Sequence, residues 1–338
     1  MENARARTAL ILGYGQIGSA VAREMAAHGW KLKVARRSAG RPALAPAALE
    51  FVQLERDAPD ALARVLGQGV DAVVDTVAYT AEHGRQWCSL AQDIGSLTVI
   101  SSISVYCDEQ GRSMDQAQGR GFPAFPAAIT EDQPCIAPGD DGYPARKAAL
   151  EQVLLEEATC PVSILRPGAI HGEQSRQPRE WWFIKRILDG RRRVPLAYAG
   201  AVRFHTSAAA NVAALCRLTS ERPGTRTLNI VDPVALSVRE IGACVAAVYG
   251  ADLAIFPLAG APVGTVGQSP WCIPSDMVMA MGRAEALGYR PVAAYGDAIA
   301  AVCRSAEAMA QSGIALPAYL GPEFFNYAAE DAIMARPS

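Results

Sequence analysis

Tyr143 and Lys147 have the residue types and the spacing that proton transfer needs. They lie four residues apart in the segment YPARK, which places the phenol and the ammonium one turn apart on the same face of a helix. A free phenol has a pKa of about 10, so it donates a proton poorly at neutral pH unless a cation stabilises the phenolate. The chain has only four lysines, so a lysine at this position is a specific feature. We predict that Tyr143 is the proton donor of a reaction and that Lys147 assists it.

Ser102 follows the apolar segment at residues 97–101, which the sequence predicts to be a β-strand. Parallel sheets bind ligands beyond the carboxyl ends of their strands. A hydroxyl at this place can hold the oxygen atom of a substrate, and it can also act as a cap at the strand end. We predict that Ser102 completes a catalytic set with Tyr143 and Lys147.

The segment GYGQIG follows the first apolar strand directly and opens a helix. In this context the glycines permit a tight turn, and they let backbone N–H groups and the positive end of the helix approach a diphosphate. The sequence therefore predicts a dinucleotide-binding turn that contains Gly13, Gly15, Gln16, Ile17 and Gly18.

The second predicted strand does not end in the carboxylate that selects NAD(H). No acidic residue stands between Glu24 and Glu50, whereas Arg36 and Arg37 stand where this strand ends. Two guanidinium groups there can bind a ribose 2′-phosphate through charge-assisted hydrogen bonds, although they can also be solvated surface residues. The sequence therefore favours NADP(H) over NAD(H). Asp57, after the third strand, can accept a hydrogen bond from the adenine amine or cap the helix that follows.

These residues lie in an alternation of short apolar strands and helical segments. We predict strands at residues 8–13, 32–35, 51–54, 72–77, 97–101, 162–166 and 227–232, and helices at residues 16–28, 58–66, 82–94, 143–158, 179–188, 237–249 and 296–312. Such alternation indicates βαβ units and a parallel sheet. We expect an α/β fold, a Rossmann-type doubly wound parallel sheet with a smaller C-terminal substrate lobe. Residues 1–165 would form the NADP-binding core, and residues 166–338 mostly the substrate-binding lobe, with some elements returning to the core.

Residues 107–141 interrupt this alternation with Gly, Pro, Asp and Gln. We predict a long loop there, acting either as a substrate-side flap or as a mobile insertion. The tail after about residue 314 has no pattern that predicts an element.

The composition excludes several other classes of function. Half of the residues are hydrophobic and the formal net charge is -2, without a polybasic segment, so nucleic acid is not an expected partner. The first residues lack the apolar stretch of a signal peptide and no later run is long enough to span a bilayer, so we expect a cytoplasmic protein that has no membrane partner. The eight cysteines and four histidines lack metal-ligand spacing, so no metal site is expected.

Four segments, GYGQIG, SSISVY, YPARK and ILRPGAIHG, resemble in order and spacing those of the extended short-chain dehydrogenase/reductases, also called the NAD-dependent epimerase/dehydratase family. The resemblance covers residues 8–215 well and is loose beyond them. It implies that Ser102, Tyr143 and Lys147 are catalytic and that Ala78, Lys147 and Pro167 contact the cofactor. It also implies a homodimer that pairs helices near residues 82–94 and 143–158.

The chain departs from this family at two places. Nucleotide-sugar dehydratases follow the serine position with an Asp-Glu pair, but Ile103 and Ser104 stand here and cannot do such acid–base work. Nucleotide-sugar epimerases typically present an asparagine to the diphosphate after the sixth strand, where this chain has Ala169. The three arginines at residues 191–193 are the main candidate replacement, although such a run is more often solvated.

The resemblance and these departures together predict an oxidoreductase, specifically an NADP(H)-dependent reductase. Its substrate would be a ketone or aldehyde of a small non-nucleotide metabolite. An epimerase that acts on a sugar or a sugar nucleotide is the first alternative. A nonenzymatic NADP-responsive regulator is the second, and the intact set of Ser102, Tyr143 and Lys147 argues against it.

Overall fold

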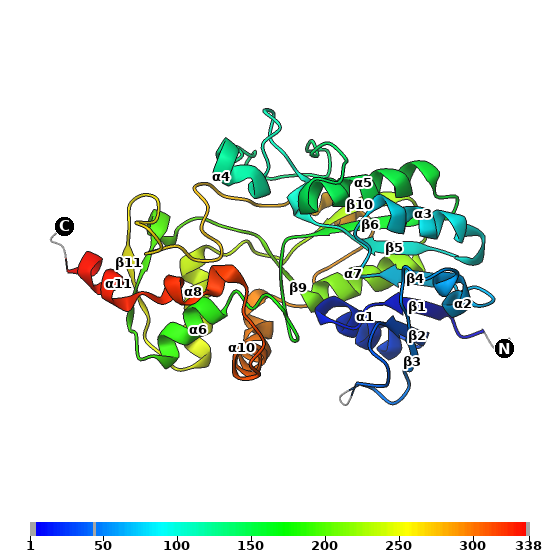
Figure 1. The fold of residues 1–338 in the computed structure, drawn as a ribbon, viewed down its shortest axis with the longest axis horizontal. Helices are drawn as coiled ribbons and strands as arrows, with labels where there is room; N and C mark the ends of the chain where they lie inside the picture. The colour runs from blue at the N-terminus through cyan, green and yellow to red at the C-terminus, as the bar shows by residue number, and fades with distance from the viewer. Residues whose placement is uncertain (1–4, 43–44, 336–338) are drawn as a thin grey trace.

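The computed structural model describes residues 5–42 and 45–335. At its centre is a seven-stranded sheet whose neighbouring strands are all parallel (Figure 1). In order across the sheet, the strands are β10 (Arg226–Ile230), β6 (Val162–Pro167), β5 (Leu97–Ile100), β4 (Ala72–Asp75), β1 (Thr8–Leu12), β2 (Lys31–Arg36) and β3 (Glu50–Gln53). The predicted Rossmann-type α/β fold is confirmed. The strand order reverses between β1 and β4, so a crevice is expected at the carboxyl ends of these two strands.

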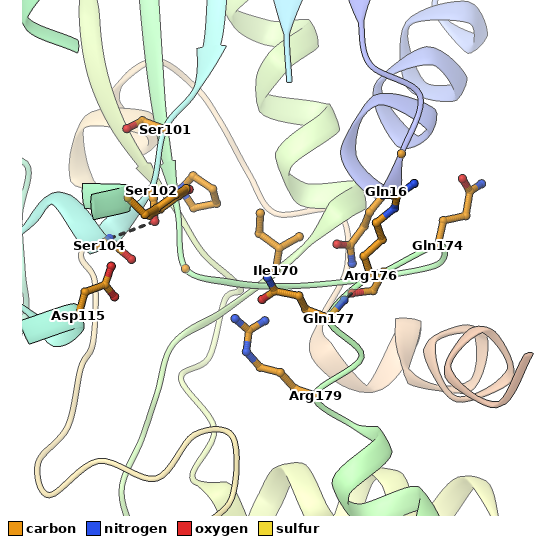
Figure 2. A pocket seen from close by; sticks show the side chains of 15 residues that line it. Gln16, Ser101, Ser102, Ser104, Asp115, Ile170, Gln174, Arg176, Gln177 and Arg179 are labelled. Carbon is orange, nitrogen blue, oxygen red and sulfur yellow. Dashed lines mark hydrogen bonds between the residues drawn. The ribbon is translucent and has the colours of Figure 1, made fainter. Parts of the chain in front are cut away.

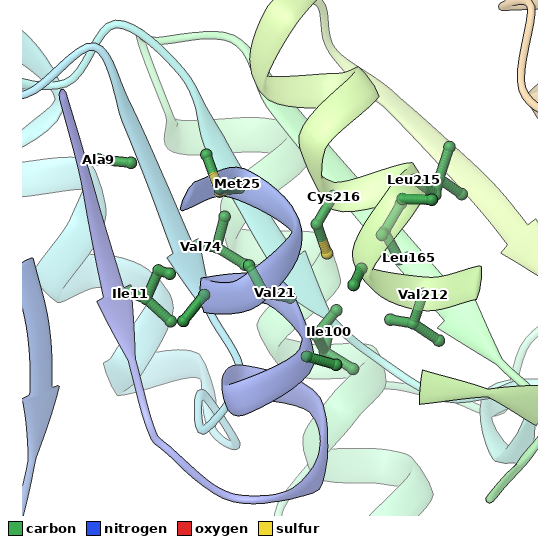
Figure 3. Close-up of a cluster of buried hydrophobic side chains, with 14 of the residues drawn as sticks. Ala9, Ile11, Val21, Met25, Val74, Ile100, Leu165, Val212, Leu215 and Cys216 are labelled. Atoms are coloured by element: carbon green, nitrogen blue, oxygen red, sulfur yellow. The ribbon is translucent and has the colours of Figure 1, made fainter. Parts of the chain in front are cut away.

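Helices cover both faces of this sheet. The first face carries α1 (Gln16–Ala27) and α7 (Ala209–Glu221), and the second carries α2 (Ala61–Leu66), α3 (Ala81–Ser89) and α5 (Gly142–Glu157). Ile11 points into the first face, where it meets Val21 and Leu215 in one apolar cluster (Figure 3). Its neighbours Leu10 and Leu12 belong to the cluster on the second face. The central strands are therefore apolar on both sides, as buried parallel strands require.

Helix α7 was not among the predicted elements. Its sequence, AANVAALCRLTSE, has a weak amphipathic pattern because small residues stand on several of its faces. These small residues let it pack closely along α1, and Val212 and Cys216 are fully buried there. This helix is stabilised by packing on the apolar face of the sheet that it covers.

A second group of elements, here called the helical lobe, lies on the left in Figure 1. It consists of α6 (Trp181–Leu188), α8 (Val238–Val248), α10 (Tyr295–Gln311), α11 (Tyr327–Met334) and the parallel pair β8 (Arg193–Leu196) and β11 (Ala254–Pro257). Its core is a separate apolar cluster around Trp182, Phe183 and Trp271. The tail, for which no element was predicted, contains α11, and the buried ion pair between Arg186 and Glu330 attaches this helix to α6. None of the helices described here is long and apolar enough to cross a membrane.

Short strands β7 (Ala169–His171) and β9 (Thr206–Ala208) pair with each other between the sheet and the helical lobe. Helix α9 (Gly282–Ala286) lies beside β10.

Residues 107–141 form an irregular segment, as predicted, with only the short α4 (Ala117–Arg120) and single turns. Asp108 holds the start of this segment, because its carboxylate accepts hydrogen bonds from the backbone N–H groups of Gln110, Arg112 and Ala124. Ile129 is fully buried and its backbone pairs with the strand-like residues near Met279. The segment is thus packed onto the body of the protein.

Candidate active site

The glycine-rich turn between β1 and α1 has the shape that a dinucleotide needs. Gly13 has a φ of 91°, and a Cβ atom there would lie 2.5 Å from Oγ1 of Thr76. A Cβ atom on Gly18 would lie 2.1 Å from the carbonyl oxygen of Gly13, so both positions require glycine. Gly15, the N-cap of α1, differs because no atom lies within 4 Å of the place where a Cβ atom would stand. The turn therefore leaves open space at the positive end of α1, which is where a diphosphate binds.

Two other residues of the predicted turn have different roles. Gln16 lines the neighbouring cavity, and its side-chain amide donates a hydrogen bond to the carbonyl oxygen of Gly172 over 3.4 Å. Ile17 is half-buried and packs against the apolar cluster under α1, on the side away from the crevice. The structure thus places Gln16 at the crevice and gives Ile17 a packing role.

A cavity of about 510 Å³ extends from Gly15 over the ends of β2 and β3. Arg36, Arg37 and Asp57 line it together, as the sequence predicted for an adenosine site. Asp57 does not cap α2, which begins four residues later after Asp60, and its carboxylate faces His83 at 3.4 Å. The arrangement fits the adenosine half of a dinucleotide, and we call this space the adenosine cavity.

Arg56 also lines the adenosine cavity, although no sequence motif pointed to it. It forms a buried ion pair with Asp75, and its Nε donates to Oε1 of Gln86 over 2.9 Å. Burial by itself would raise the pKa of Asp75, but Arg56 and the indole N–H of Trp87 outweigh this effect and lower the pKa. Asp75 also accepts hydrogen bonds from the backbone N–H groups of residues 77 and 78, so it stiffens the turn after β4.

A second cavity, of about 580 Å³, opens on the other side of Gly15, and we call it the catalytic cavity (Figure 2). It brings together residues that are far apart in the sequence: Ser102 beyond β5, Tyr143 at the start of α5 and Pro167 at the end of β6. The hydroxyl of Ser101 also lines it, and this buried oxygen has no hydrogen-bond partner within the described residues. The cavity therefore offers polar groups for a ligand at the carboxyl ends of parallel strands.

Tyr143 is partly exposed to the catalytic cavity and its ring stacks on that of Tyr79, with 5.6 Å between the ring centroids. Removal from water raises the pKa of the Tyr143 phenol. The Ser102 hydroxyl opposes this rise, whereas the negative charge of Asp115 adds to it. The phenol is thus protonated at neutral pH and ready to donate.

Lys147 lies beneath the cavity and is almost fully buried. Its Nζ atom donates to the carbonyl oxygens of Ala78, over 2.6 Å, and Ile100, over 2.8 Å. Burial lowers its pKa to about 8. Its ammonium lies 5.9 Å from the ring centroid of Tyr143 and is not among the groups that shift the pKa of the phenol. In this structure Lys147 fastens α5 to the ends of β4 and β5, and thereby positions Tyr143.

The Ser102 side chain has one of the two roles that the sequence allowed, that of a cap at the strand end. Its Oγ accepts a hydrogen bond from the backbone N–H of Ser104 over 3.1 Å, which caps the turn after β5. It also lines the catalytic cavity beside Tyr143. Ala78 is buried under the crevice, and its carbonyl oxygen is engaged by Lys147.

Three charged residues of the catalytic cavity were missed by sequence reasoning. Asp115 reaches it from the irregular segment 107–141, on the side of Ser104, and Arg176 and Arg179 reach it from the connection between β7 and α6 (Figure 2). None of them stands in a motif or at a strand end. No signal in the sequence separates them from the other acidic residues and arginines of the chain.

The arginine run at residues 191–193 was a possible replacement for a diphosphate ligand, although such a run is more often solvated, and it is not part of either cavity. Arg191 pairs with Asp331 of α11, and the guanidinium of Arg193 lies over the ring of Phe256 at 4.6 Å. These residues stabilise the helical lobe. The structure therefore gives no support to the less favoured role of this run as a phosphate ligand.

No group of three or more His, Cys, Asp or Glu side chains in the described part of the chain is arranged to hold a metal ion.

A model of the NAD dependent epimerase/dehydratase family matches residues 9–230. No curated protein sequence matches the chain. Similar solved structures include MoeE5 in complex with UDP-glucose and NAD, with 18% identity, a TM-score of 0.64, and coverage of 90% of this chain and 99% of that one. The UDP-glucose 4-epimerase of Thermus thermophilus in complex with NAD has 17% identity, a TM-score of 0.65, and coverage of 89% and 99%. Bordetella bronchiseptica WbmH in complex with NAD+ has 16% identity, a TM-score of 0.65, and coverage of 92% and 100%. At these identities the likeness shows a common fold.

Proposed function

The chain belongs to the NAD-dependent epimerase/dehydratase family and is an NAD(P)-dependent oxidoreductase of the extended short-chain dehydrogenase/reductase type, and from this premise we propose that it acts on a phosphate-bearing sugar derivative. The reaction is hydride transfer at a carbon that carries a hydroxyl or carbonyl oxygen. The observation that carries the proposal is the lining of the catalytic cavity, where Ser102 and Tyr143 share one space with Arg176 and Arg179.

The nicotinamide ring, when bound, supplies or takes the hydride. Ser102 and Tyr143 donate hydrogen bonds to the substrate oxygen, and Tyr143 gives its phenolic proton to that oxygen on reduction or receives it on oxidation. The structure of the free protein supports the reducing direction for this proton, because the phenol has a raised pKa and is protonated. Lys147 keeps Tyr143 in place through its two backbone carbonyl bonds.

Arg176 and Arg179 supply the reason to expect an anionic substrate. Neither forms an ion pair within the described residues, so their guanidinium groups are available to a phosphate. The MoeE5 structures contain UDP-glucose and UDP-glucuronic acid, which carry phosphate next to a sugar. A nucleoside diphosphate sugar is therefore our first candidate substrate.

A reductase that acts on a small non-nucleotide carbonyl compound is the second candidate. Ala169 favours it, because this residue offers no side-chain amide to a diphosphate. Net reduction consumes one reduced cofactor for each substrate, whereas an epimerase regenerates the cofactor that it starts with.

We also propose that the enzyme prefers NADP(H). Arg36 and Arg37 support this choice, since both line the adenosine cavity. The similar solved structures named above contain NAD, so the preference has to be measured on this chain.

The test combines binding and turnover. Calorimetric titration of UDP, GDP and dTDP into the NADP-loaded protein should show micromolar binding of at least one nucleotide. That binding should fall in Arg179→Ala and persist in Arg239→Ala, which removes an exposed arginine of α8 outside both cavities. If no nucleotide binds, absorbance assays with small aldehydes, ketones and sugar phosphates test the second candidate. Cofactor-dependent turnover of a carbonyl compound without phosphate would then favour the second candidate substrate over the nucleoside diphosphate sugar.

A further inference from the structure

The adenosine cavity and the catalytic cavity meet at one place. Among the described residues, only Gly15 and Arg176 line both. Gly15 comes from the turn at the start of α1, and Arg176 comes from the far side, in the connection between β7 and α6. A ligand that extends through both cavities is therefore expected to contact these two residues.

Arg176 belongs to a short stretch, residues 172–179, that we call the bridging segment. One end of it contacts α1, through the hydrogen bond from Gln16 to the carbonyl oxygen of Gly172 and the 3.6 Å ion pair between Arg23 and Glu173. Its middle contacts α10, because the backbone N–H of Gln174 donates to Oγ of Ser305 over 2.8 Å. The bridging segment thus lies between the dinucleotide-binding turn and the helical lobe.

The backbone of the bridging segment is held in a costly conformation. Gln174 has a φ of 61°, in the left-handed region that residues other than glycine rarely adopt. The bond to Ser305 fixes this conformation, and the buried Ser175 hydroxyl accepts a hydrogen bond from the backbone N–H of Gln177 over 3.2 Å. The strained turn directs the chain so that Arg176 lies near Gln16 (Figure 2), and Arg176 lines the catalytic cavity together with Gly15.

The charges around the junction favour an anion. The positive end of α1 faces it from one side and the guanidinium of Arg176 from the other. Arg176 forms no ion pair within the part of the chain that the structure describes. Asp115 lines only the catalytic cavity, and Glu55 and Asp57 line only the adenosine cavity, so no carboxylate lines both.

We propose that Arg176 binds the diphosphate of the dinucleotide from the side opposite the glycine-rich turn. The open space above Gly15 can accommodate a diphosphate. The diphosphate joins the two nucleoside halves of a dinucleotide, so it is the group expected where the two cavities meet. The proposal rests on the proposed function only in its use of a dinucleotide, and it holds for either candidate substrate. It also links the cofactor to the substrate, because Gln177 and Arg179 of the same bridging segment line the catalytic cavity.

Three probes distinguish which phosphate group Arg176 binds. NADP+ carries both the diphosphate and the 2′-phosphate, NAD+ carries only the diphosphate, and 2′,5′-ADP carries the 2′-phosphate with a single 5′-phosphate in place of the diphosphate. Calorimetric titrations of each probe should be made with the wild type, Arg176→Ala, Arg176→Lys and the double variant Arg36→Ala/Arg37→Ala.

Arg176→Ala should weaken the binding of NADP+ and of NAD+ by the same factor, roughly 10- to 100-fold, because a charge-assisted hydrogen bond to the diphosphate is lost in both cases. It should weaken the binding of 2′,5′-ADP by a smaller factor, because this probe keeps only one of the two phosphates of the diphosphate. Arg176→Lys should recover part of the loss, because it restores the charge but not the paired donors. Arg179→Ala is the matched control on the same segment and should retain wild-type affinity for all three probes. Circular dichroism and thermal unfolding of each variant check that the fold is intact.

Three results would overturn the proposal. Unchanged affinity for NADP+ and NAD+ in Arg176→Ala would show that Arg176 does not touch the cofactor. Weaker binding of NADP+ and 2′,5′-ADP, with NAD+ unchanged, would assign Arg176 to the 2′-phosphate instead. A wild-type protein that binds neither dinucleotide would refute the use of a dinucleotide itself, and with it the proposed function as well as this proposal.

Discussion

The two ends of the crevice are built in different ways. The glycine-rich turn is made of six consecutive residues, and its geometry leaves no choice of residue at Gly13 and Gly18. The catalytic cavity collects its charged groups from segments far apart in the chain, namely residues 107–141 and the bridging segment 172–179. A local steric requirement can be recognised as a motif in the sequence, whereas a charged residue that is positioned by tertiary packing follows no local pattern.

The largest effect should come from the catalytic cavity. Tyr143→Phe removes one hydroxyl and should lower turnover by roughly 100- to 10,000-fold, the range that general acid catalysis supplies. The fold and the affinity for NADP+ should stay nearly unchanged. Steady-state kinetics and calorimetry measure the two quantities. Tyr79→Phe is the matched control, since it removes the neighbouring phenol, which does not line the cavity. Near wild-type turnover in Tyr143→Phe would exclude this residue as the proton donor.

The next effect separates two glycines of one turn. Gly18→Ala should destabilise the protein by roughly 3 kcal/mol or more, because its methyl group would collide with the carbonyl of Gly13. Gly15→Ala should leave stability almost unchanged, since its methyl group would point into open space, and should instead weaken dinucleotide binding. Urea unfolding and calorimetry compare the two variants. Equal loss of stability in both would contradict the assigned geometry.

Lys147, which lies buried beneath the catalytic cavity, gives a prediction on how the stability of the protein depends on pH. Burial disfavours its charged form, so the folded pKa of about 8 lies below the ordinary value of 10.5. Between these two pH values the unfolded chain binds more protons than the folded one, so the Lys147 contribution to stability rises with pH across this window. The total change is on the order of 3 kcal/mol. It should appear as a growing stability difference between the wild type and Lys147→Met, measured by urea unfolding from pH 7.5 to 10.5. A difference that is constant with pH would contradict the lowered pKa.

Much of the fold followed from the sequence because strands of a parallel sheet are apolar throughout and are separated by helices. The seven sheet strands, from β1 to β10, overlap the seven predicted ones. Helix α7 was missed because its small residues give a weak pattern, and α11 because the pairing of Arg186 with Glu330 joins residues that lie 144 positions apart.

The proposed site shows the same division. Ser102 was predicted from its place at a strand end and Tyr143 from its spacing to Lys147, and both line the catalytic cavity. For arginines that bind the substrate, the sequence offered only the run at 191–193 as a candidate, because clustering was the only available signal. The arginines that line the cavity, Arg176 and Arg179, are brought there by a strained turn at Gln174 that no local pattern predicts.

A smaller effect is expected at the adenosine end. Replacing Arg36 and Arg37 together by Ala should weaken NADP+ binding by about 1 to 3 kcal/mol, the range for hydrogen bonds to charged groups, with little change for NAD+. Calorimetry with both cofactors measures this. Equal affinities of the wild type for NADP+ and NAD+ would refute the proposed cofactor preference.

The smallest effect concerns Asp115, which came to the catalytic cavity from the irregular segment. Its own pKa is raised by burial, and its charge raises the pKa of Tyr143. Asp115→Asn removes that charge, so the pKa of Tyr143 should fall, because a phenolate forms more easily without a negative neighbour. The shift can be measured without a substrate, as the difference in phenolate absorbance between Asp115→Asn and its double variant with Tyr143→Phe. Glu109→Gln, which removes an exposed carboxylate of the same segment outside the cavity, is the control.

For the reducing direction this shift has a definite sign. The reaction needs a protonated Tyr143, so a lower pKa moves the alkaline limb of the kcat/KM profile to lower pH. Activity near neutral pH should change little, because the phenol stays protonated there. An alkaline limb that stays in place in Asp115→Asn would mean that the charge of Asp115 does not affect the pKa of Tyr143. A limb that moves to higher pH would mean that a group other than Tyr143 controls it. Because the segment 107–141 is anchored by Asp108 and by the buried Ile129, the comparison with Glu109→Gln separates the charge of Asp115 from any loosening of the segment that carries it.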